Sequence, residues 1–186
     1  MEADWEFEIG GDAPVIEVQW PGFVDLRQSP ERSRQLPEDA QLPTLAEALA
    51  KLNGPASPVW SSKCGFWPHL EADAFDPDEL DAPLGLAAHA MGCYIDLLPR
   101  NDEQWPQPAL AADACKRVCS LLRAVPLRCC RADLVIRRAF ITPELIGLGI
   151  TAYLTSCGES EDEATVTLKA ALAAFVGAIC GHSTLE

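Results

Sequence analysis

One short pattern recurs along the chain and constrains its fold more than any other feature. Residues 92–97 read Gly-Cys-Tyr-Ile-Asp-Leu, and residues 22–26 repeat the order glycine, aromatic, β-branched, aspartate, leucine. Each copy precedes a polar, proline-containing loop and then an Ala/Leu-rich segment with helical spacing. Residues 152–155 form a degraded third copy, again ahead of a helix. This internal repeat predicts strand–loop–helix units.

The order of the expected elements extends this pattern to the whole chain. Apolar spacing and turn residues predict extended segments at 15–20 and 23–26, a helix at 44–53, strands at 59–67 and 86–98, a helix at 109–125, a hairpin of 133–141 with 145–157, and a helix between Ser160 and Gly181. The first six elements have the order of a ferredoxin-like βαββαβ sandwich. We therefore expect an α+β fold, with that sandwich extended by a C-terminal strand and helix, and with the helices on one face of a mostly antiparallel sheet.

Length and composition indicate one globular domain. The 186 residues are 48% hydrophobic and 23% charged, which is enough apolar material for a sizeable core. We assign residues 1–184 to a single domain and interpret residues 185–186 as a cloning scar. The acidic N-terminus lacks the basic and apolar regions of a signal peptide, and no apolar run reaches membrane-spanning length. The sequence thus predicts a cytoplasmic protein without a membrane partner.

The net charge of −14 is unevenly distributed. Residues 1–113 hold 21 acidic and 6 basic residues, whereas residues 114–186 hold 7 acidic and 8 basic ones. Such a charge argues against binding to nucleic acid phosphates. Two interpretations remain open: the acidic part and the basic segment 116–138 neutralise each other, or an acidic face captures a basic protein partner.

The strongest candidate for such a face follows the strand at 59–67. Its loop is acidic and punctuated by proline, and Pro77 together with the lack of a turn glycine argues against a calcium loop. Aromatic anchors beside acidic residues are typical of protein-binding surfaces. The partner-binding candidates are Trp67, Glu71, Asp73, Asp76, Asp78, Glu79 and Asp81.

The alternative is a pocket between the sheet and the helices, which would serve a small-molecule binder or an enzyme. Its candidate residues are Cys64, His89, Tyr94 and Asp96. Cys64 follows Lys63, and a neighbouring cation favours a reactive thiolate. His89 shares a strand face with Met91 and Cys93, which suits a soft metal but is also ordinary in a core.

Other constellations argue against catalysis. Asp25 and Asp96 would lie at opposite edges of a ferredoxin-like sheet, so we expect no paired carboxylates. The eight cysteines lack zinc-site spacing and predict reduced, buried thiols. No phosphate-binding, metalloprotease or esterase motif occurs. We therefore favour a non-catalytic protein-binding module, assign no catalytic residues, metal or cofactor, and consider a homo-oligomer compatible with the sequence.

Overall fold

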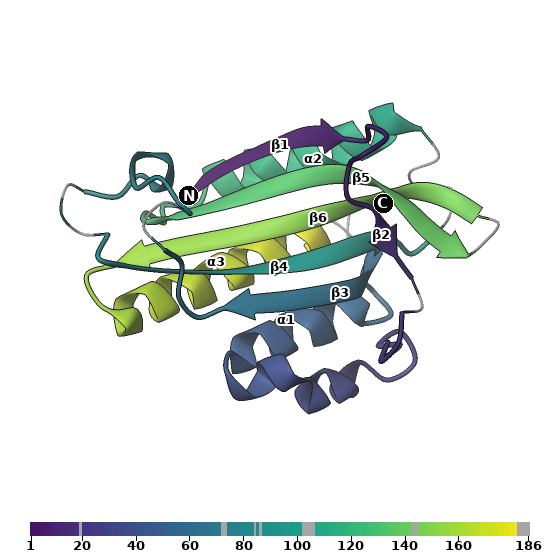
Figure 1. Ribbon diagram of the computed structural model, residues 1–186, viewed down its shortest axis with the longest axis horizontal. Helices are drawn as coiled ribbons and strands as arrows, with labels where there is room; N and C mark the ends of the chain where they lie inside the picture. The colour runs from purple at the N-terminus through teal and green to yellow at the C-terminus, as the bar shows by residue number, and fades with distance from the viewer. Residues whose placement is uncertain are drawn as a thin grey trace.

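The computed structural model describes residues 1–18, 20–71, 74–83, 85, 87–101, 107–142 and 145–181 (Figure 1). Its strands are β1 (Glu2–Glu8), β2 (Ile16–Glu17), β3 (Val59–Trp67), β4 (His89–Pro99), β5 (Cys130–Thr142) and β6 (Leu145–Gly158). Its α-helices are α1 (Pro43–Asn53), α2 (Pro108–Arg123) and α3 (Glu161–Cys180). Three short 3₁₀ helices complete the described elements: η1 (Pro30–Gln35), η2 (Pro37–Ala40) and η3 (Asp78–Leu80).

The strands form one mixed sheet in the order β1-β5-β6-β4-β3, and β2 pairs with the far end of β5. The β3–β4, β4–β6 and β5–β6 pairs are antiparallel, whereas β1 and β2 run parallel to β5. Tyr94 of β4 lies opposite Tyr153 of β6, which fixes the register of the central pair. The sheet is therefore largely antiparallel, as expected from the sequence.

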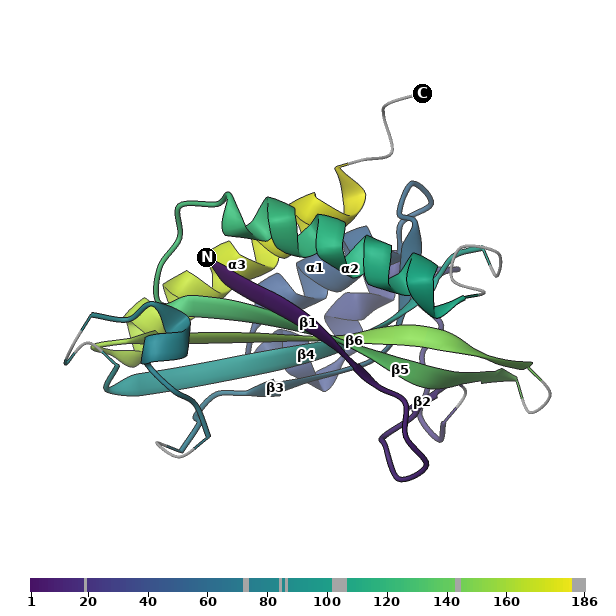
Figure 2. The same cartoon turned by 90° about the horizontal axis from the view of Figure 1, so that it is seen from above.

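All three α-helices cover the same face of this sheet (Figure 2). Side chains of β4 alternate, so Met91, Cys93, Ile95 and Leu97 are buried in the core that the helices close. The fold is therefore α+β, and the sheet has one covered and one open face.

Helix α3 runs across the centre of the sheet and begins at a capping box that the sequence predicts. The Ser160 hydroxyl accepts a hydrogen bond of 3.2 Å from the Glu163 backbone amide. The apolar stripe Leu168, Leu172 and Phe175 is fully buried. By length and hydropathy alone, α3 also meets the criterion for a membrane-spanning helix, a criterion that core helices of soluble proteins meet as well. Location in the cytoplasm stays a prediction.

The first strand is not where the sequence analysis places it. Among the described residues of the expected extended segments at 15–20 and 23–26, only Ile16–Glu17 is a strand, and the sequence did not predict the edge strand β1 (Glu2–Glu8). Residues 22–26 form a loop in which Gly22 has a φ of +93°. The first copy of the repeat is thus no strand, while the other copies lie in β4 and β6, which pair with each other.

The ferredoxin-like strand order is not confirmed. In that order the first strand would lie beside β4, but here β6 occupies this position and β1 lies at the sheet edge against β5. The reason is physical: the two hairpins β3–β4 and β5–β6 bring long apolar strands together, whereas β1 has only Ala3 and Trp5 to turn toward the helices.

Candidate functional site

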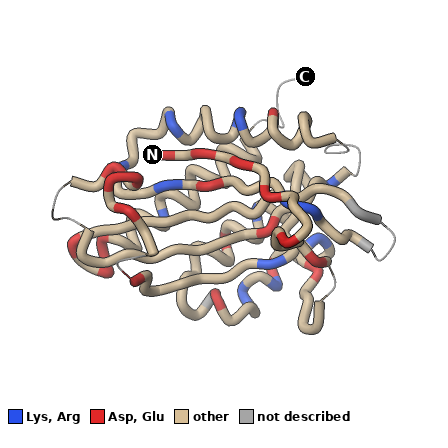
Figure 3. Tube along the Cα trace, turned by 45° about the horizontal axis from the view of Figure 1, so that its top comes forward, with Lys and Arg blue, Asp and Glu red and all other residues tan. Residues whose placement is uncertain are grey.

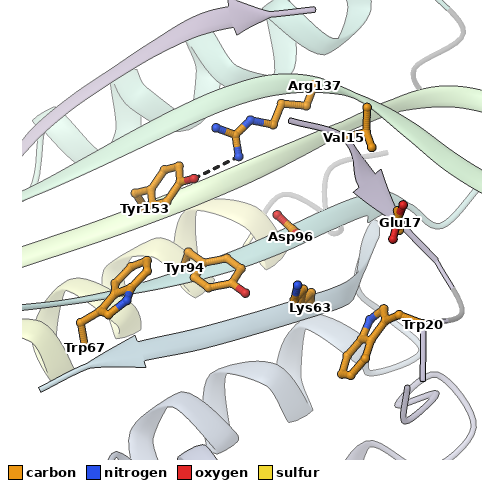
Figure 4. A pocket seen from close by; sticks show the side chains of 9 residues that line it. All are labelled: Val15, Glu17, Trp20, Lys63, Trp67, Tyr94, Asp96, Arg137 and Tyr153. Carbon is orange, nitrogen blue, oxygen red and sulfur yellow. Dashed lines mark hydrogen bonds between the residues drawn. The ribbon is translucent and has the colours of Figure 1, made fainter. Parts of the chain in front are cut away.

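The open face of the sheet carries the most chemically varied group of side chains in the described chain. Alternation along each strand directs to this face the residues whose neighbours fill the core. β4 contributes Tyr94 and Asp96, β6 contributes Tyr153, and β5 contributes Arg137. Lys63 and Trp67 of β3 lie beside them, and β2 with its flanking loop closes one side (Figure 4).

These side chains surround a pocket of about 290 Å³. Its lining residues are Val15, Glu17, Trp20, Lys63, Trp67, Tyr94, Asp96, Arg137 and Tyr153. They come from the segment around β2 and from all four long strands, β3 to β6. The pocket therefore exists only in the folded sheet and combines an aromatic part with two acidic and two basic residues.

Three aromatic rings form a triangular cluster, in which the Trp67 and Tyr153 centroids are also only 6.5 Å apart. Trp67 and Tyr94 have ring centroids 5.4 Å apart, and Tyr94 and Tyr153 are 6.2 Å apart. The planes of Trp67 and Tyr153 differ by only 16°. Gly65 lies opposite Tyr94 and makes room for its ring, because a β-carbon there would come within 2.5 Å of Cε1 of Tyr94. Trp67 is 40% exposed, so this aromatic cluster is accessible from solvent.

Asp96 is the buried acid of the pocket, with only 8% of its surface exposed. Its Oδ1 accepts a hydrogen bond of 2.6 Å from the Thr151 hydroxyl, while no described residue donates one to Oδ2. Burial raises the pKa of Asp96, and the Thr151 hydrogen bond and the charges of Arg137 and Lys63 act in the opposite direction. Asp96 thus offers one free oxygen in a partly desolvated site.

Arg137 is held in place by groups on two strands, β1 and β6. Its Nε donates to Glu8 of β1 at 2.9 Å, and its Nη1 donates to the Tyr153 hydroxyl at 3.0 Å and to the Thr151 hydroxyl at 3.2 Å. Its side chain is 13% exposed. Because Glu8 balances its charge, Arg137 mainly orients Tyr153 and Thr151, which in turn supports Asp96.

Several donors in the pocket have no partner in the described chain. The Trp20 Nε1 atom is buried and makes no hydrogen bond there. The Lys63 Nζ lies 5.9 Å from the Trp20 ring centroid and makes no ion pair with a described residue. Burial, followed by the nearby charge of Asp96, raises the pKa of Tyr94 to about 12, so its hydroxyl is a neutral donor. Buried polar groups without partners are uncommon and mark positions where a ligand can supply them.

Of the four pocket candidates from the sequence, Tyr94 and Asp96 lie together, and Cys64 and His89 do not line this pocket. Cys64 packs against the core and lines a neighbouring cavity of about 300 Å³. Burial raises the pKa of Cys64 to about 12, helped by Glu38 and Asp96, which is contrary to an activated nucleophile. His89 begins β4 opposite Gly158. The open-face pocket is thus separate from the Cys64 cavity, which lies between β3 and the helical segments that contribute Leu49 and Glu38.

The two strand-associated aspartates do not form a pair. Asp25 lies in the loop before η1 and binds Arg27 through both carboxylate oxygens, at 2.9 and 2.7 Å. The Arg27 guanidinium stacks on Trp60 at 4.0 Å. Asp25 does not line the Asp96 pocket. No group of three metal-ligating side chains occurs among the described residues.

The partner-binding candidates of the acidic loop lie near one end of the sheet (Figure 3). Asp81 forms an ion pair of 2.8 Å with Arg128, Glu79 lies 3.5 Å from Arg131, and Asp76 accepts a hydrogen bond from the Asp78 amide at 2.9 Å. Glu71, whose side chain is 82% exposed, lies 4.0 Å from His69. Asp73 lies outside the described residues. Trp67 belongs to the pocket instead of the acidic loop.

The basic segment 116–138 is largely engaged with acidic residues. Five of its seven bases form ion pairs: Lys116 with Asp113, Arg123 with Asp4, Arg128 with Asp81, Arg131 with Glu79 and Asp133, and Arg137 with Glu8. These contacts reduce the negative field along β1 and η3. The first of the two interpretations of the charge pattern therefore has direct geometric support.

Sequence reasoning missed six of the lining residues, namely Val15, Glu17, Trp20, Lys63, Arg137 and Tyr153. For Arg137 and Tyr153 a usable signal exists, because each is a polar residue in a strand whose neighbouring residues are apolar and buried. Leu134 and Ile136, for example, are buried just before Arg137. For Trp20 and Glu17 no periodic signal exists, because they lie at or beyond the end of a two-residue strand. Their position depends on where β2 pairs with β5.

Known proteins give no indication of the function of this pocket. The chain matches no protein-family model, no curated protein and no solved structure. The residues that converge on the open face, and the contacts among them, therefore carry the functional argument.

Proposed function

We propose that the open-face pocket binds a small zwitterionic ligand of the amino-acid class, with a cationic and an anionic group and an apolar part. One observation carries the proposal: Asp96, whose Oδ2 accepts no hydrogen bond from a described residue, and Lys63, which forms no ion pair with a described residue, line the same pocket. A ligand that satisfies both needs a donor and an acceptor of its own.

The cationic group belongs at Asp96. A carboxylate that is 8% exposed, with one oxygen that no described residue pairs, favours a charged donor, because a charge-assisted hydrogen bond offsets its desolvation. Tyr94 lines the same pocket, and its ring adds attraction for a cation. Arg137 does not replace the ligand cation, since Glu8, Thr151 and Tyr153 already use its donors.

The anionic group belongs on the side of Lys63. This lysine supplies a charge and three donors, and the Trp20 indole N–H adds one more. The neutral Tyr94 hydroxyl is a third donor. A carboxylate of the ligand pairs these groups without displacing any hydrogen bond within the described chain.

The apolar part of the ligand packs on the aromatic cluster of Trp67, Tyr94 and Tyr153. Trp67 is the most accessible of its rings, and a cavity of about 290 Å³ accommodates a molecule of amino-acid size. Both charged groups and the aromatic surface are needed to fill the pocket. This requirement separates a zwitterion from a simple amine or a simple acid.

Isothermal titration calorimetry with a matched trio tests the proposal. Phenylalanine carries both charges, phenethylamine lacks the carboxylate, and 3-phenylpropanoate lacks the ammonium. The twenty standard amino acids are titrated alongside to select the side chain. We expect an amino acid to bind at least about tenfold more tightly than its amine or acid analogue, since each lost charge-assisted hydrogen bond is worth about 1.5–3 kcal/mol.

Variants locate the binding event. Asp96→Asn should weaken binding of the zwitterion and the amine, and Lys63→Met should weaken binding of the zwitterion and the acid. Asp25→Asn and Lys51→Met are charge-matched controls outside the pocket and should leave affinity unchanged. Equal affinity for all three members of the trio, no binding of any standard amino acid, or an equal loss in the control variants would refute the proposal.

A protein partner is a second candidate, supported by the acidic end of the sheet. Glu71 and Asp78 beside η3, together with Glu161 and Asp162 in the first turn of α3, are exposed and make no ion pair with a described arginine or lysine. A basic, cytoplasmic protein, for example a toxin or nuclease that this chain neutralises, fits such a surface. Neither candidate function requires catalysis by this chain.

A salt-dependent pull-down tests this second candidate. The variant Glu71→Lys/Asp78→Lys should lose a partner that wild type retains at low ionic strength, and high salt should release that partner. Glu31→Lys/Glu47→Lys is the control with the same charge change on another surface. A partner retained equally by both variants and at both salt concentrations counts against the electrostatic proposal.

A further inference from the structure

Two cysteines lie side by side where β5 begins and β6 ends. Cys129 immediately precedes β5, and the Cys157 backbone amide of β6 donates a hydrogen bond of 2.9 Å to the Cys129 carbonyl. The next pair along the ladder is Cys130 with Ser156, so Cys129 and Cys157 are directly opposite each other. Hydrogen-bonded antiparallel pairs have Cα atoms about 5.5 Å apart, within the range that a disulfide spans.

The two side chains also meet. Cys129 packs against the small apolar cluster of Leu80, Ala90 and Cys157, and both cysteines line one cavity of about 370 Å³ next to the first turns of α3. Burial, followed by the charge of the neighbouring Cys129 and a hydrogen bond with it, raises the pKa of Cys157 to about 11. Both thiols are free in this structure.

Cys129 differs from its partner in access and backbone conformation. It is half-buried, whereas Cys157 is 1% exposed. Its φ of 60° lies in the left-handed region, which is unfavourable for most residues with a β-carbon. Arg128 precedes it, and its guanidinium interacts electrostatically with Cys129. An oxidant that enters the cavity therefore meets Cys129 first.

We propose that Cys129 and Cys157 are a peroxide-sensitive thiol pair that closes to a reversible disulfide. In the first step the Cys129 thiol gives up its proton and its sulfur attacks hydrogen peroxide. The O–O bond breaks and the leaving hydroxide takes up that proton, so Cys129 sulfenic acid and water form. In the second step the Cys157 sulfur attacks the Cys129 sulfur, the S–O bond breaks, and a second water leaves. Two thiols and one peroxide thus give one disulfide and two waters, and a dithiol reverses the reaction.

Peptide mapping under non-reducing conditions tests this inference. The full chain is treated with hydrogen peroxide at the dose that oxidises half of an equimolar glutathione standard, alkylated, digested and analysed by mass spectrometry. We expect a peptide that links Cys129 to Cys157 with the loss of two hydrogen atoms, and its disappearance after dithiothreitol. In Cys157→Ser, Cys129 should instead be trapped as a sulfenic acid by dimedone.

Cys180 provides the control, because it is half-buried and lies at the end of α3. Cys180→Ser should leave the yield of the linked peptide unchanged, and Cys129→Ser should abolish it while the circular dichroism spectrum stays that of wild type. The inference is overturned if both thiols stay reduced at this dose, if Cys129 is oxidised while Cys157 stays alkylatable, or if another cysteine pair links instead. These outcomes do not depend on ligand binding at the open-face pocket.

Discussion

Gly65 lies directly opposite Tyr94 across the β3–β4 pair, and the Tyr94 ring covers the space that a side chain would need. A β-carbon at position 65 would lie 2.5 Å from Cε1 of Tyr94 and 3.2 Å from Cδ1. The absence of a side chain on one strand thus sets the position of an aromatic ring on the next. The missing side chain at position 65 therefore allows the aromatic cluster of the open-face pocket to form.

Gly65→Ala should displace the Tyr94 ring and disturb its contact with Trp67. We expect a loss of stability of about 1–3 kcal/mol, as in other overpacked sites, and a change in tryptophan fluorescence. Urea denaturation measures the first effect. Gly177→Ala is the control: it lies in α3 with nothing within 4 Å of the added carbon, so it should stabilise by about 0.5–1 kcal/mol. A Gly65→Ala variant as stable as wild type would contradict the packing argument.

Asp96 and Asp25 should give stability profiles of opposite slope with pH. Burial raises the pKa of Asp96 above its ordinary 3.8, so its contribution to stability is fully present below pH 3.8 and is lost as the pH rises through the raised value. The hydrogen bonds from Arg27 lower the pKa of Asp25, so its contribution is present above pH 3.8 and is lost as the pH falls through the lowered value.

Urea denaturation of Asp96→Asn and Asp25→Asn between pH 3 and pH 7 measures these slopes. As the pH rises, the free energy of unfolding of Asp96→Asn should increase relative to that of wild type. That of Asp25→Asn should decrease relative to wild type. The two variants have the same charge change, so differences in net charge cancel in the comparison. Parallel pH profiles would show that burial does not govern Asp96.

Asn53 is a buried amide that joins the end of α1 to β3. Its Nδ2 donates to the Leu49 carbonyl at 2.9 Å and to the Ser61 hydroxyl at 2.7 Å, and its Oδ1 accepts from the Ser61 amide at 3.1 Å. Asn53→Ala leaves the buried Ser61 groups unpaired and should cost roughly 2–4 kcal/mol. Lys51 lies two residues earlier in α1 and is exposed. Lys51→Ala should therefore change the free energy of unfolding by less than about 0.5 kcal/mol in a urea denaturation assay.

Apolar spacing and capping residues predicted the elements that depend on interactions between residues close in the sequence. The helix spacing of Leu168, Leu172 and Phe175, the capping box at Ser160, and the β5–β6 hairpin are all present. The strand β1 was missed although Ala3 and Trp5 alternate with acidic residues, because those acids also suit a solvated tail. The 22–26 copy of the repeat was assigned to a strand, but Gly22 turns the chain there.

The sequence by itself determined the α+β class, the central strand around Tyr94 and Asp96, and the helices that cover one face, because apolar periodicity specifies which side of each element is buried. Only the tertiary structure decided that β6 lies beside β4, and that Trp20, Lys63, Arg137 and Tyr153 join Asp96 in one pocket. Strand order and register depend on pairings between segments far apart in the chain, and a shift of one residue would turn every one of these side chains to the other face.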